Sequence, residues 1–238
     1  PTDRKHKLTG TKVMMLDFTA ILSQWQLLLD GAELTAKLAL VTTVTGFLIG
    51  TLCAIARRSQ SRVFARVAAV YVESIRNTPF LVQIFLVYFG LSSMGFSFSA
   101  FTVSVIALTI NVGAYTAEIM RAGFESVHKG QWEAAETLGL TKWQQYWHVA
   151  LRPAIERVYP SLTSQFILLM LASSVTSQIS TEELTATANF IQSETYRPFE
   201  TFVIVAGIYI ALSLLMRLIF WLFGQAIFPR RRRLGTMI

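Results

Sequence analysis

Long apolar runs separated by shorter polar links dominate the chain. A helix needs about 20 apolar residues to cross the hydrocarbon core of a bilayer. Five runs meet this requirement and predict five membrane-spanning helices, at about residues 34–56, 64–91, 100–119, 158–178 and 202–228. The second run has a polar break from Glu73 to Pro79, where proline removes a helix hydrogen bond and predicts a kink. The pattern therefore predicts an all-α integral membrane protein.

The links between these runs alternate in charge. The links after the first and third runs are basic, residues 92–99 after the second have no charge, and the link after the fourth is acidic. Basic residues accumulate in cytoplasmic loops. The order therefore places the start of the first helix outside and the C-terminus in the cytoplasm. We expect residues 229–238, with four consecutive arginines at 230–233, to form a basic cytoplasmic tail that contacts anionic lipid headgroups.

The N-terminal segment, residues 1–30, does not fit this alternation, because its basic residues would lie outside. Residues 13–29 are fairly apolar, but Asp17, Gln24 and Gln26 interrupt them. We expect an amphipathic helix that lies in the membrane interface. The alternative is a sixth spanning helix over residues 13–29, which would bring the basic start of the chain into the cytoplasm.

Composition supports a membrane protein and excludes several classes of function. Of 238 residues, 53% are hydrophobic and 15% are charged, whereas soluble domains have about 25% charged residues. The mean hydropathy is +0.49. The net charge of +7 is concentrated at the ends of apolar runs, so we expect no nucleic-acid partner. One cysteine and three scattered histidines predict neither a disulfide nor a metal site. The chain has no Gly-x4-Gly-Lys-(Ser/Thr) phosphate loop, so we expect no nucleotide bound in that way.

The link between the third and fourth runs predicts two short helices that meet at a glycine. Residues 131–138 are good helix formers, Gly139 is typical of a helix C-terminus, and Thr141 can cap a second helix. This arrangement is a compact projecting elbow. Its four aromatic residues suit a protein interface or the lipid headgroup layer; they are Trp132, Trp143, Tyr146 and Trp147.

The spacing within this link resembles the EAA loop of ABC importer permeases. Glu133, Ala134 and Ala135 are followed after three residues by Gly139, and after nine more by Val149. The family pattern ends in Leu-Pro, whereas here Arg152 precedes the proline and shifts it by one place.

Three further segments resemble the polar amino-acid branch of these permeases, which serves histidine, glutamine, glutamate, arginine and opines. Residues 71–83 look like its Arg-Gly-Thr-Pro segment with Asn77 in place of glycine, residues 114–123 are similar to its third-helix signature, and residues 31–57 also fit. The fourth run departs most, because residues 172–177 read Ala-Ser-Ser-Val-Thr-Ser where the branch often has Lys-(Asp/Asn)-Thr-Ser-Leu. Substrate identity is therefore left open.

The resemblance implies a type I ABC importer transmembrane subunit, with a permease domain over residues 31–228 and a cytoplasmic coupling loop over residues 131–150. It implies the cytoplasmic (inner) membrane of a bacterium and transport of a polar or charged amino acid or a close derivative. Implied partners are two copies of an ABC ATPase that binds ATP and Mg, a second permease chain, identical or homologous, and an extracytoplasmic solute-binding protein. The ATPase contact would include Glu133, Ala134, Ala135 and Gly139. The alternative function is a passive channel for amino acids or small solutes without an ATPase partner.

Polar residues inside spanning helices are functional candidates, because lipid disfavours them. Candidates for the substrate path are Gln83, Asn111, Tyr115, Glu118, Ser173, Ser174, Thr176 and Gln178. Candidates for a structural or gating role are Glu73, Arg76, Pro79 and Arg121.

Each group of candidates also has a purely structural interpretation. The two glutamate–arginine pairs, Glu73–Arg76 and Glu118–Arg121, have a spacing of three residues that predicts ion pairs, which we expect to be structural. The amides and Tyr115 can hydrogen-bond between helices, and serines can serve as small packing residues. Seven polar residues in the fourth run exceed what packing requires, which favours a polar path there.

Overall fold

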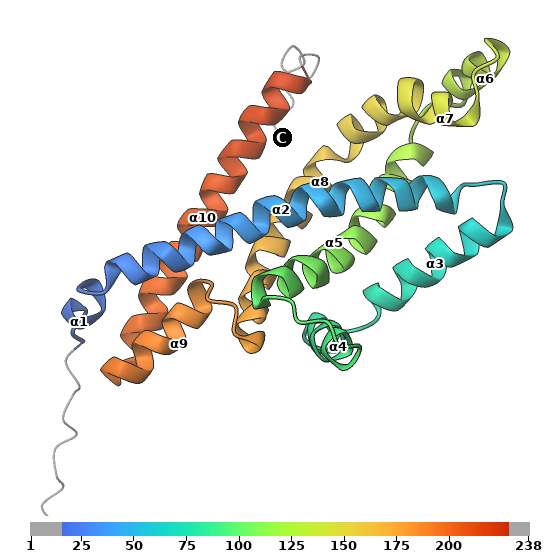
Figure 1. Cartoon of the computed structure of the whole chain (residues 1–238). Coiled ribbons are helices and arrows are strands. Elements are labelled where there is room, and N and C mark those ends of the chain that lie inside the picture. Colours follow the sequence, from blue (N-terminus) through green and yellow to red (C-terminus); the bar gives the residue numbers. More distant parts are fainter. Residues whose placement is uncertain (1–15, 229–238) are drawn as a thin grey trace, which may run out of the picture.

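The computed structural model describes residues 16–228, and within this range every regular element is a helix (Figure 1). The all-α prediction is confirmed. In chain order the helices are α1 Thr19–Leu22, α2 Trp25–Arg57, α3 Arg62–Arg76, α4 Phe80–Ser93, α5 Ala100–Glu125, α6 Lys129–Thr137, α7 Lys142–Gln144, the π-helix η1 Gln145–Ala150, α8 Leu151–Ala172, the 3₁₀-helix η2 Ser173–Ile179, α9 Leu184–Thr195 and α10 Pro198–Ile227.

Among the described residues, four stretches are long and apolar enough to cross a membrane: α2, α5, the continuous helical stretch Lys142–Ile179 that contains α8, and α10. The predicted second span, residues 64–91, is divided into α3 and α4 rather than being one kinked helix. The cause is Pro79, which has extended backbone angles of −64° and 140° and precedes the first turn of α4. Proline has no N–H to continue the helix and disfavours helical angles at the residue before it.

The described part of the N-terminal segment contains one short helix before the first span. Within residues 16–24 only α1, a single turn, is helical, and α2 begins at Trp25 rather than at residue 34. The described part of residues 13–29 therefore forms no separate spanning helix. Residues 1–15 and the basic tail at 229–238 lie outside the described residues.

Small residues allow α2 to pack closely along α5. A methyl group added to Gly46 would lie 2.1 Å from a methyl carbon of Val112, and one added to Gly50 would lie 2.6 Å from Cβ of Thr116. Membrane helices use small residues for such close approach, because lipid provides no hydrophobic force between helices. This α2–α5 contact is the centre of the bundle, and α8 packs against it.

Helix α9 was not predicted, because the acidic link was interpreted by its charge alone. Leu184, Ala188 and Ile191 are fully buried, with spacings of four and three residues that place them on one helix face. They pack against Ile21 and Leu28 at the start of the bundle. The link is therefore a packed helix and not an exposed loop.

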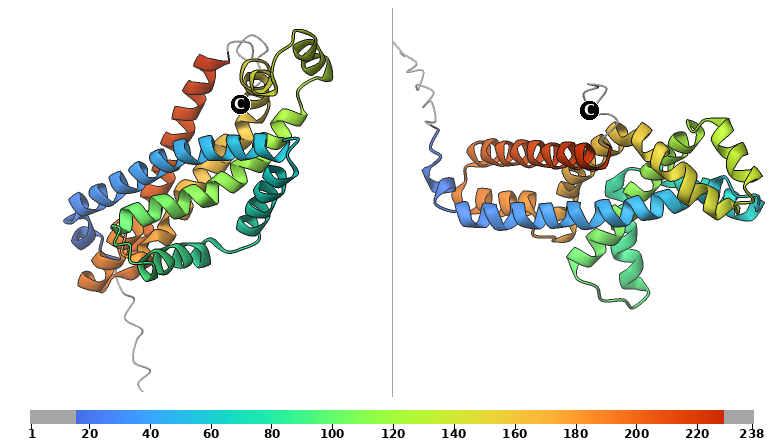
Figure 2. Two further views of the ribbon diagram at one scale, coloured as in Figure 1. Left: turned by 45° about the vertical axis from the view of Figure 1, so that its right-hand side comes forward. Right: turned by 90° about the horizontal axis from the view of Figure 1, so that it is seen from above.

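The two ends of the bundle are different. Figures 1 and 2 show α6 and α7 beyond the C-terminal end of α2, and α1 and α9 together at its other end. At the second end an ion pair joins Asp17 to Arg197, with Oδ2 and Nη2 3.4 Å apart. Residue 17 is thus held at the end that the charge pattern places outside the cell.

Candidate transport pathway and coupling elbow

A cluster of charged side chains joins α2, α3 and α5. The carboxylate of Glu118 accepts hydrogen bonds from Arg57 and Arg121, and Nη1 of Arg76 lies 3.8 Å from Glu118 Oε2. Arg121 also pairs with Glu125 at 2.5 Å. One carboxylate therefore holds three guanidinium groups from three helices.

This cluster confirms one predicted ion pair and contradicts the other. Glu118 and Arg121 pair as expected. No ion pair within residues 16–228 joins Glu73 to Arg76, because Arg76 instead reaches α5 and lies over the ring of Tyr115, 5.7 Å from its centroid. Helix α3 ends at Arg76, and the backbone carbonyl of Glu73 accepts a hydrogen bond from the side-chain amide Nδ2 of Asn77 at 2.8 Å. The contact between helices thus replaces the predicted contact along one helix.

Two amides bridge the break between α3 and α4. Gln83 Nε2 donates to the carbonyl oxygens of Ile75 at 2.7 Å and Thr78 at 3.0 Å, at the end of α3. Gln83 Oε1 accepts from Asn111 Nδ2 at 2.8 Å. Gln83 and Asn111 therefore hydrogen-bond between helices, which was the structural interpretation of these two candidates for the substrate path.

Four hydroxyl groups at the end of the fourth span bond within their own helix. Ser173, Ser174, Thr176 and Ser177 each donate to the carbonyl three residues earlier, at 2.6, 2.8, 2.7 and 2.8 Å. This spacing matches a 3₁₀-helix, in which backbone bonds also span three residues. Ser173 and Thr176 are fully buried, while Ser174 is partly exposed and Gln178 is exposed. Of the candidates in this span, Ser174 and Gln178 are therefore the ones that reach the surface of the chain.

The predicted elbow is present, from α6 through η1. Gly139 has a φ of +72°, and the N–H groups of Gly139 and Leu140 donate back to Glu136 and Ala135 at 2.9 and 3.1 Å. This is the glycine-terminated helix end that the sequence predicted. Thr141 and Gln144 then form a reciprocal capping box at the start of α7.

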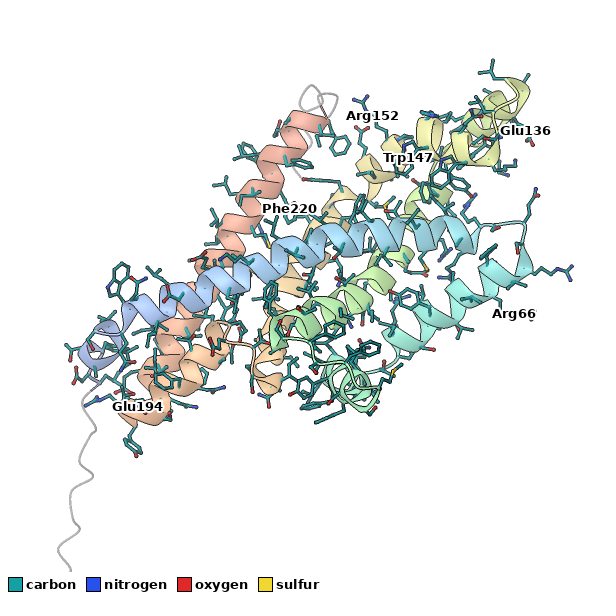
Figure 3. All side chains as sticks on the ribbon, viewed as in Figure 1. Arg66, Glu136, Trp147, Arg152, Glu194 and Phe220 are labelled. Atoms are coloured by element: carbon teal, nitrogen blue, oxygen red, sulfur yellow. The ribbon has the colours of Figure 1, made fainter. Side chains whose placement is uncertain are left out.

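The coupling candidates do not all face outward. Glu133, Ala134 and Gly139 are exposed, and Leu138 beside them is 77% exposed. Ala135 is 2% exposed and lies inside the elbow. Glu133, Ala134 and Leu138 therefore face outward, and Ala135 supports α6 from within. Figure 3 shows Glu136 at the tip of this projection and Trp147 closer to the bundle.

Arg58 connects this elbow to the end of α2, a contact that the sequence did not reveal. Its Nε donates to Tyr146 Oη at 3.0 Å, and its guanidinium lies 5.6 Å from the centroid of Trp132. Tyr146 meets Trp132 and Phe124 edge to face, at 5.1 and 5.2 Å. Because Arg58 follows an apolar run, its charge was assigned to membrane topology alone.

Glu183 is a second unexpected residue. It is fully buried and caps α9, with Oε1 accepting from the N–H of Ala186 at 3.0 Å and Oε2 from the hydroxyl of Tyr209 at 2.8 Å. Burial raises the pKa of this carboxyl above its usual range, although the hydrogen bonds oppose that shift. Among the described residues, no three His, Cys, Asp or Glu side chains gather where they could hold a metal ion.

Comparison with known sequences decides the family. The sequence profile described as "Binding-protein-dependent transport system inner membrane component" matches residues 46–229. The chain belongs to this family. The resemblance inferred from the elbow motif is thereby confirmed, as is the inner-membrane location, and the chain is a transport permease.

Relatives at about one-third identity extend over most of the chain. The glutamine transport system permease protein GlnP of Escherichia coli is 35% identical, covering 87% of this chain and 95% of its own length. The arginine transport system permease protein ArtQ of Bacillus subtilis is 32% identical, covering 87% and 94%. The nopaline transport system permease protein NocM of Agrobacterium fabrum is 34% identical, covering 83% and 86%.

Solved structures agree on the architecture. A chain of "an amino acid ABC transporter with histidines" is 38% identical, with a TM-score of 0.80 over 90% of this chain and 100% of that one. A chain of the MetNI methionine ABC transporter, 19% identical, has the same fold, with a TM-score of 0.72 over 86% and 98%. The chain thus has the fold of a type I ABC importer permease.

Proposed function

We propose that this chain is the transmembrane permease subunit of an ATP-driven importer. It would take a polar or charged amino acid, or a close derivative, from an extracytoplasmic binding protein and release it into the cytoplasm by alternating access. ATP and Mg would bind to a separate ATPase, present in two copies. The family supports permease function, and the elbow supports coupling to a motor.

The exposed face of the elbow is the observation that carries this proposal. Glu133, Ala134 and Leu138 project from α6 beyond the spanning helices, so a cytoplasmic partner can reach them without entering the membrane. Leu138, which follows α6, is 77% exposed and offers apolar surface that a groove in a partner can cover. A passive channel would have no need for such a projection, and the family does not favour that alternative.

The substrate class is inferred from the names of the relatives and from the polar surface of the bundle. Those names specify glutamine, arginine and nopaline. Arg76, with a side chain that is 41% exposed, and the exposed Gln178 lie on the surface of the single chain, not inside it. This placement fits a pathway completed by a second permease chain, identical or homologous, with Tyr115 and Glu118 beside it.

The test is transport by the complete complex in lipid vesicles. With the ATPase and binding protein present, uptake of a labelled amino acid should require ATP, and Glu133→Arg should abolish both uptake and co-purification of the ATPase. Glu194→Arg is the matched control for co-purification, because Glu194 is exposed on α9 at the opposite end of the bundle (Figure 3). ATP-independent flux through the wild type, or normal uptake by Glu133→Arg, would exclude the proposal.

A further inference from the structure

Arg217 is a charged residue inside a spanning helix without a partner in the described structure. It is the one charge of α10 after Glu200, and its side chain is exposed. Within residues 16–228 it makes no ion pair or hydrogen bond. An ionisable residue in a membrane span needs an explanation, because leaving its charge in hydrocarbon is unfavourable.

The position of Arg217 along α10 lies inside the hydrocarbon core, within reach of the cytoplasmic headgroups. The helix has 30 residues, and about 20 of them fill the hydrocarbon core. Centring the core leaves about five residues at each end, so Arg217 lies about five residues, or about 8 Å, inside the cytoplasmic boundary. A long arginine side chain can cross that distance to the phosphate layer. Trp221, one turn closer to the cytoplasm and 45% exposed, suits the interface.

Beside Arg217 is a groove between α8 and α10, with a volume of about 450 Å³. Pro160, Ser164 and Ile167 line its α8 side, and Leu214, Arg217 and Trp221 line its α10 side. The hydroxyl of Ser164 is exposed and has no hydrogen-bond partner within residues 16–228. The groove thus offers a guanidinium and a free hydroxyl donor, and no carboxylate lines it.

We propose that this groove binds the phosphate of an anionic phospholipid from the cytoplasmic leaflet. Arg217 supplies the charge and Ser164 a hydrogen bond, as in the basic pockets between membrane helices that hold acidic headgroups. The acyl chains would follow Leu214 and Leu218, which are 60% and 50% exposed. A second copy related by a two-fold axis fits less well, because it would bring two cations together with no carboxylate in the groove to neutralise them.

Native mass spectrometry of the delipidated full chain, titrated with phosphatidylglycerol or phosphatidylcholine, tests this site directly. Arg217→Gln should weaken phosphatidylglycerol binding about fivefold, as expected for one cation near a charged membrane surface. Arg217→Lys should retain most of the binding, and Ser164→Ala should lose about twofold, the weaker effect of a neutral hydrogen bond. Phosphatidylcholine binding should change little in any variant. The matched control is Arg66→Gln, because Arg66 is an exposed arginine on α3 that lies far from α10 (Figure 3).

Three results would overturn the site. The first is equal loss of phosphatidylglycerol in Arg217→Gln and Arg66→Gln, which would indicate diffuse attraction. The second is displacement of the lipid by millimolar inorganic phosphate, which would indicate a site for free phosphate. The third is loss of a dimer in lipid-free detergent on Arg217→Gln, which would show that a protein chain covers the groove. None of these measurements depends on transport, so the lipid site and the proposed function can fail separately.

Discussion

Arg57 and Arg58 are adjacent at the end of α2, yet their guanidinium groups contact different parts of the molecule. Arg57 binds Glu118 in the charged cluster on α5, whereas Arg58 binds Tyr146 and stacks on Trp132 in the elbow. We therefore expect a movement of the elbow to reach α2 and, one residue away, the charged cluster beside the proposed pathway. These two consecutive side chains link the aromatic residues of the elbow to that cluster.

We expect Arg58→Ala to uncouple ATP hydrolysis from transport. The variant loses a hydrogen bond and a cation–π contact that together contribute about 1–2 kcal/mol. In reconstituted vesicles, the amount of amino acid taken up per ATP should fall by up to about thirtyfold, while co-purification of the ATPase persists. Arg62→Ala, which removes an exposed arginine four residues later on α3, should leave that ratio unchanged. An unchanged ratio in Arg58→Ala would show that the contact has no part in coupling.

Substitutions of Gly139 can separate the effect of its backbone conformation on ATPase binding from the steric effect of an added side chain. Its φ is +72°, and a methyl group added to it would meet no atom within 4 Å. Gly139→Val should strain the end of α6 by about 1–2 kcal/mol and reduce ATPase co-purification. Gly139→Asn should retain more of it, because asparagine tolerates left-handed angles. Equal loss in both variants would indicate that any side chain blocks the partner.

Removing the carboxylate of Glu118 should destabilise the bundle. The Glu118→Gln variant leaves three guanidinium groups close together without the negative charge that holds them, those of Arg57, Arg76 and Arg121. Because these side chains are 18–41% exposed, we expect a loss of about 1–3 kcal/mol, less than for a fully buried pair. The melting temperature in detergent should fall, and Glu118→Gln combined with Arg121→Gln should recover part of the loss. A melting temperature unaffected by Glu118→Gln would contradict this account.

The buried carboxyl of Glu183 predicts a dependence of stability on pH. Its folded pKa lies above the usual 4.5 because of burial, so the folded chain binds its proton more tightly than the unfolded chain does. This contribution to stability is complete below the unfolded pKa and is lost as pH rises through the folded pKa. Raising the pH from about 4.5 should therefore destabilise the wild type relative to Glu183→Gln. This prediction is tested by measuring the melting temperatures of the wild type and of Glu183→Gln as the pH is raised. Glu194→Gln, which changes an exposed glutamate, is the control.

The close contact between α2 and α5 predicts opposite outcomes for two glycines. In Gly46→Ala the new methyl group would lie 2.1 Å from Val112, so the helices must separate, and we expect a loss of about 1–3 kcal/mol. In Gly207→Ala the methyl group meets nothing within 4 Å in α10, and alanine favours a helix. Thermal unfolding in detergent should show a clear decrease for the first variant only.

Local patterns were predicted well from the sequence. The glycine end of α6 and the cap at Thr141 depend on neighbouring residues, so both could be inferred before any packing was known. Of the five spans that the apolar runs predicted, four are confirmed, and the second, where Pro79 predicted a kink, is divided into two helices.

Contacts between distant segments could not be predicted in the same way. Arg76 pairs with Glu118 rather than Glu73 because the packing of α3 on α5 places it there. Glu183 was counted only as one charge of an acidic link, since nothing adjacent in sequence shows that α9 folds back onto α2 and α10. Tertiary packing, which a charge pattern does not contain, determines both outcomes.

The 3₁₀-helix that ends the fourth span also has a mechanical consequence. A 3₁₀-helix rises about 2.0 Å per residue with three residues per turn, against about 1.5 Å and 3.6 for an α-helix. Rewinding the seven residues Ser173–Ile179 as α-helix would shorten them by about 3.5 Å and rotate their far end by about 140°. The serine and threonine hydroxyls can follow such a change, because they bond to carbonyls three or four residues back in either form. In this segment a small shortening along the helix axis would therefore accompany a large rotation of Gln178, which lies near its far end.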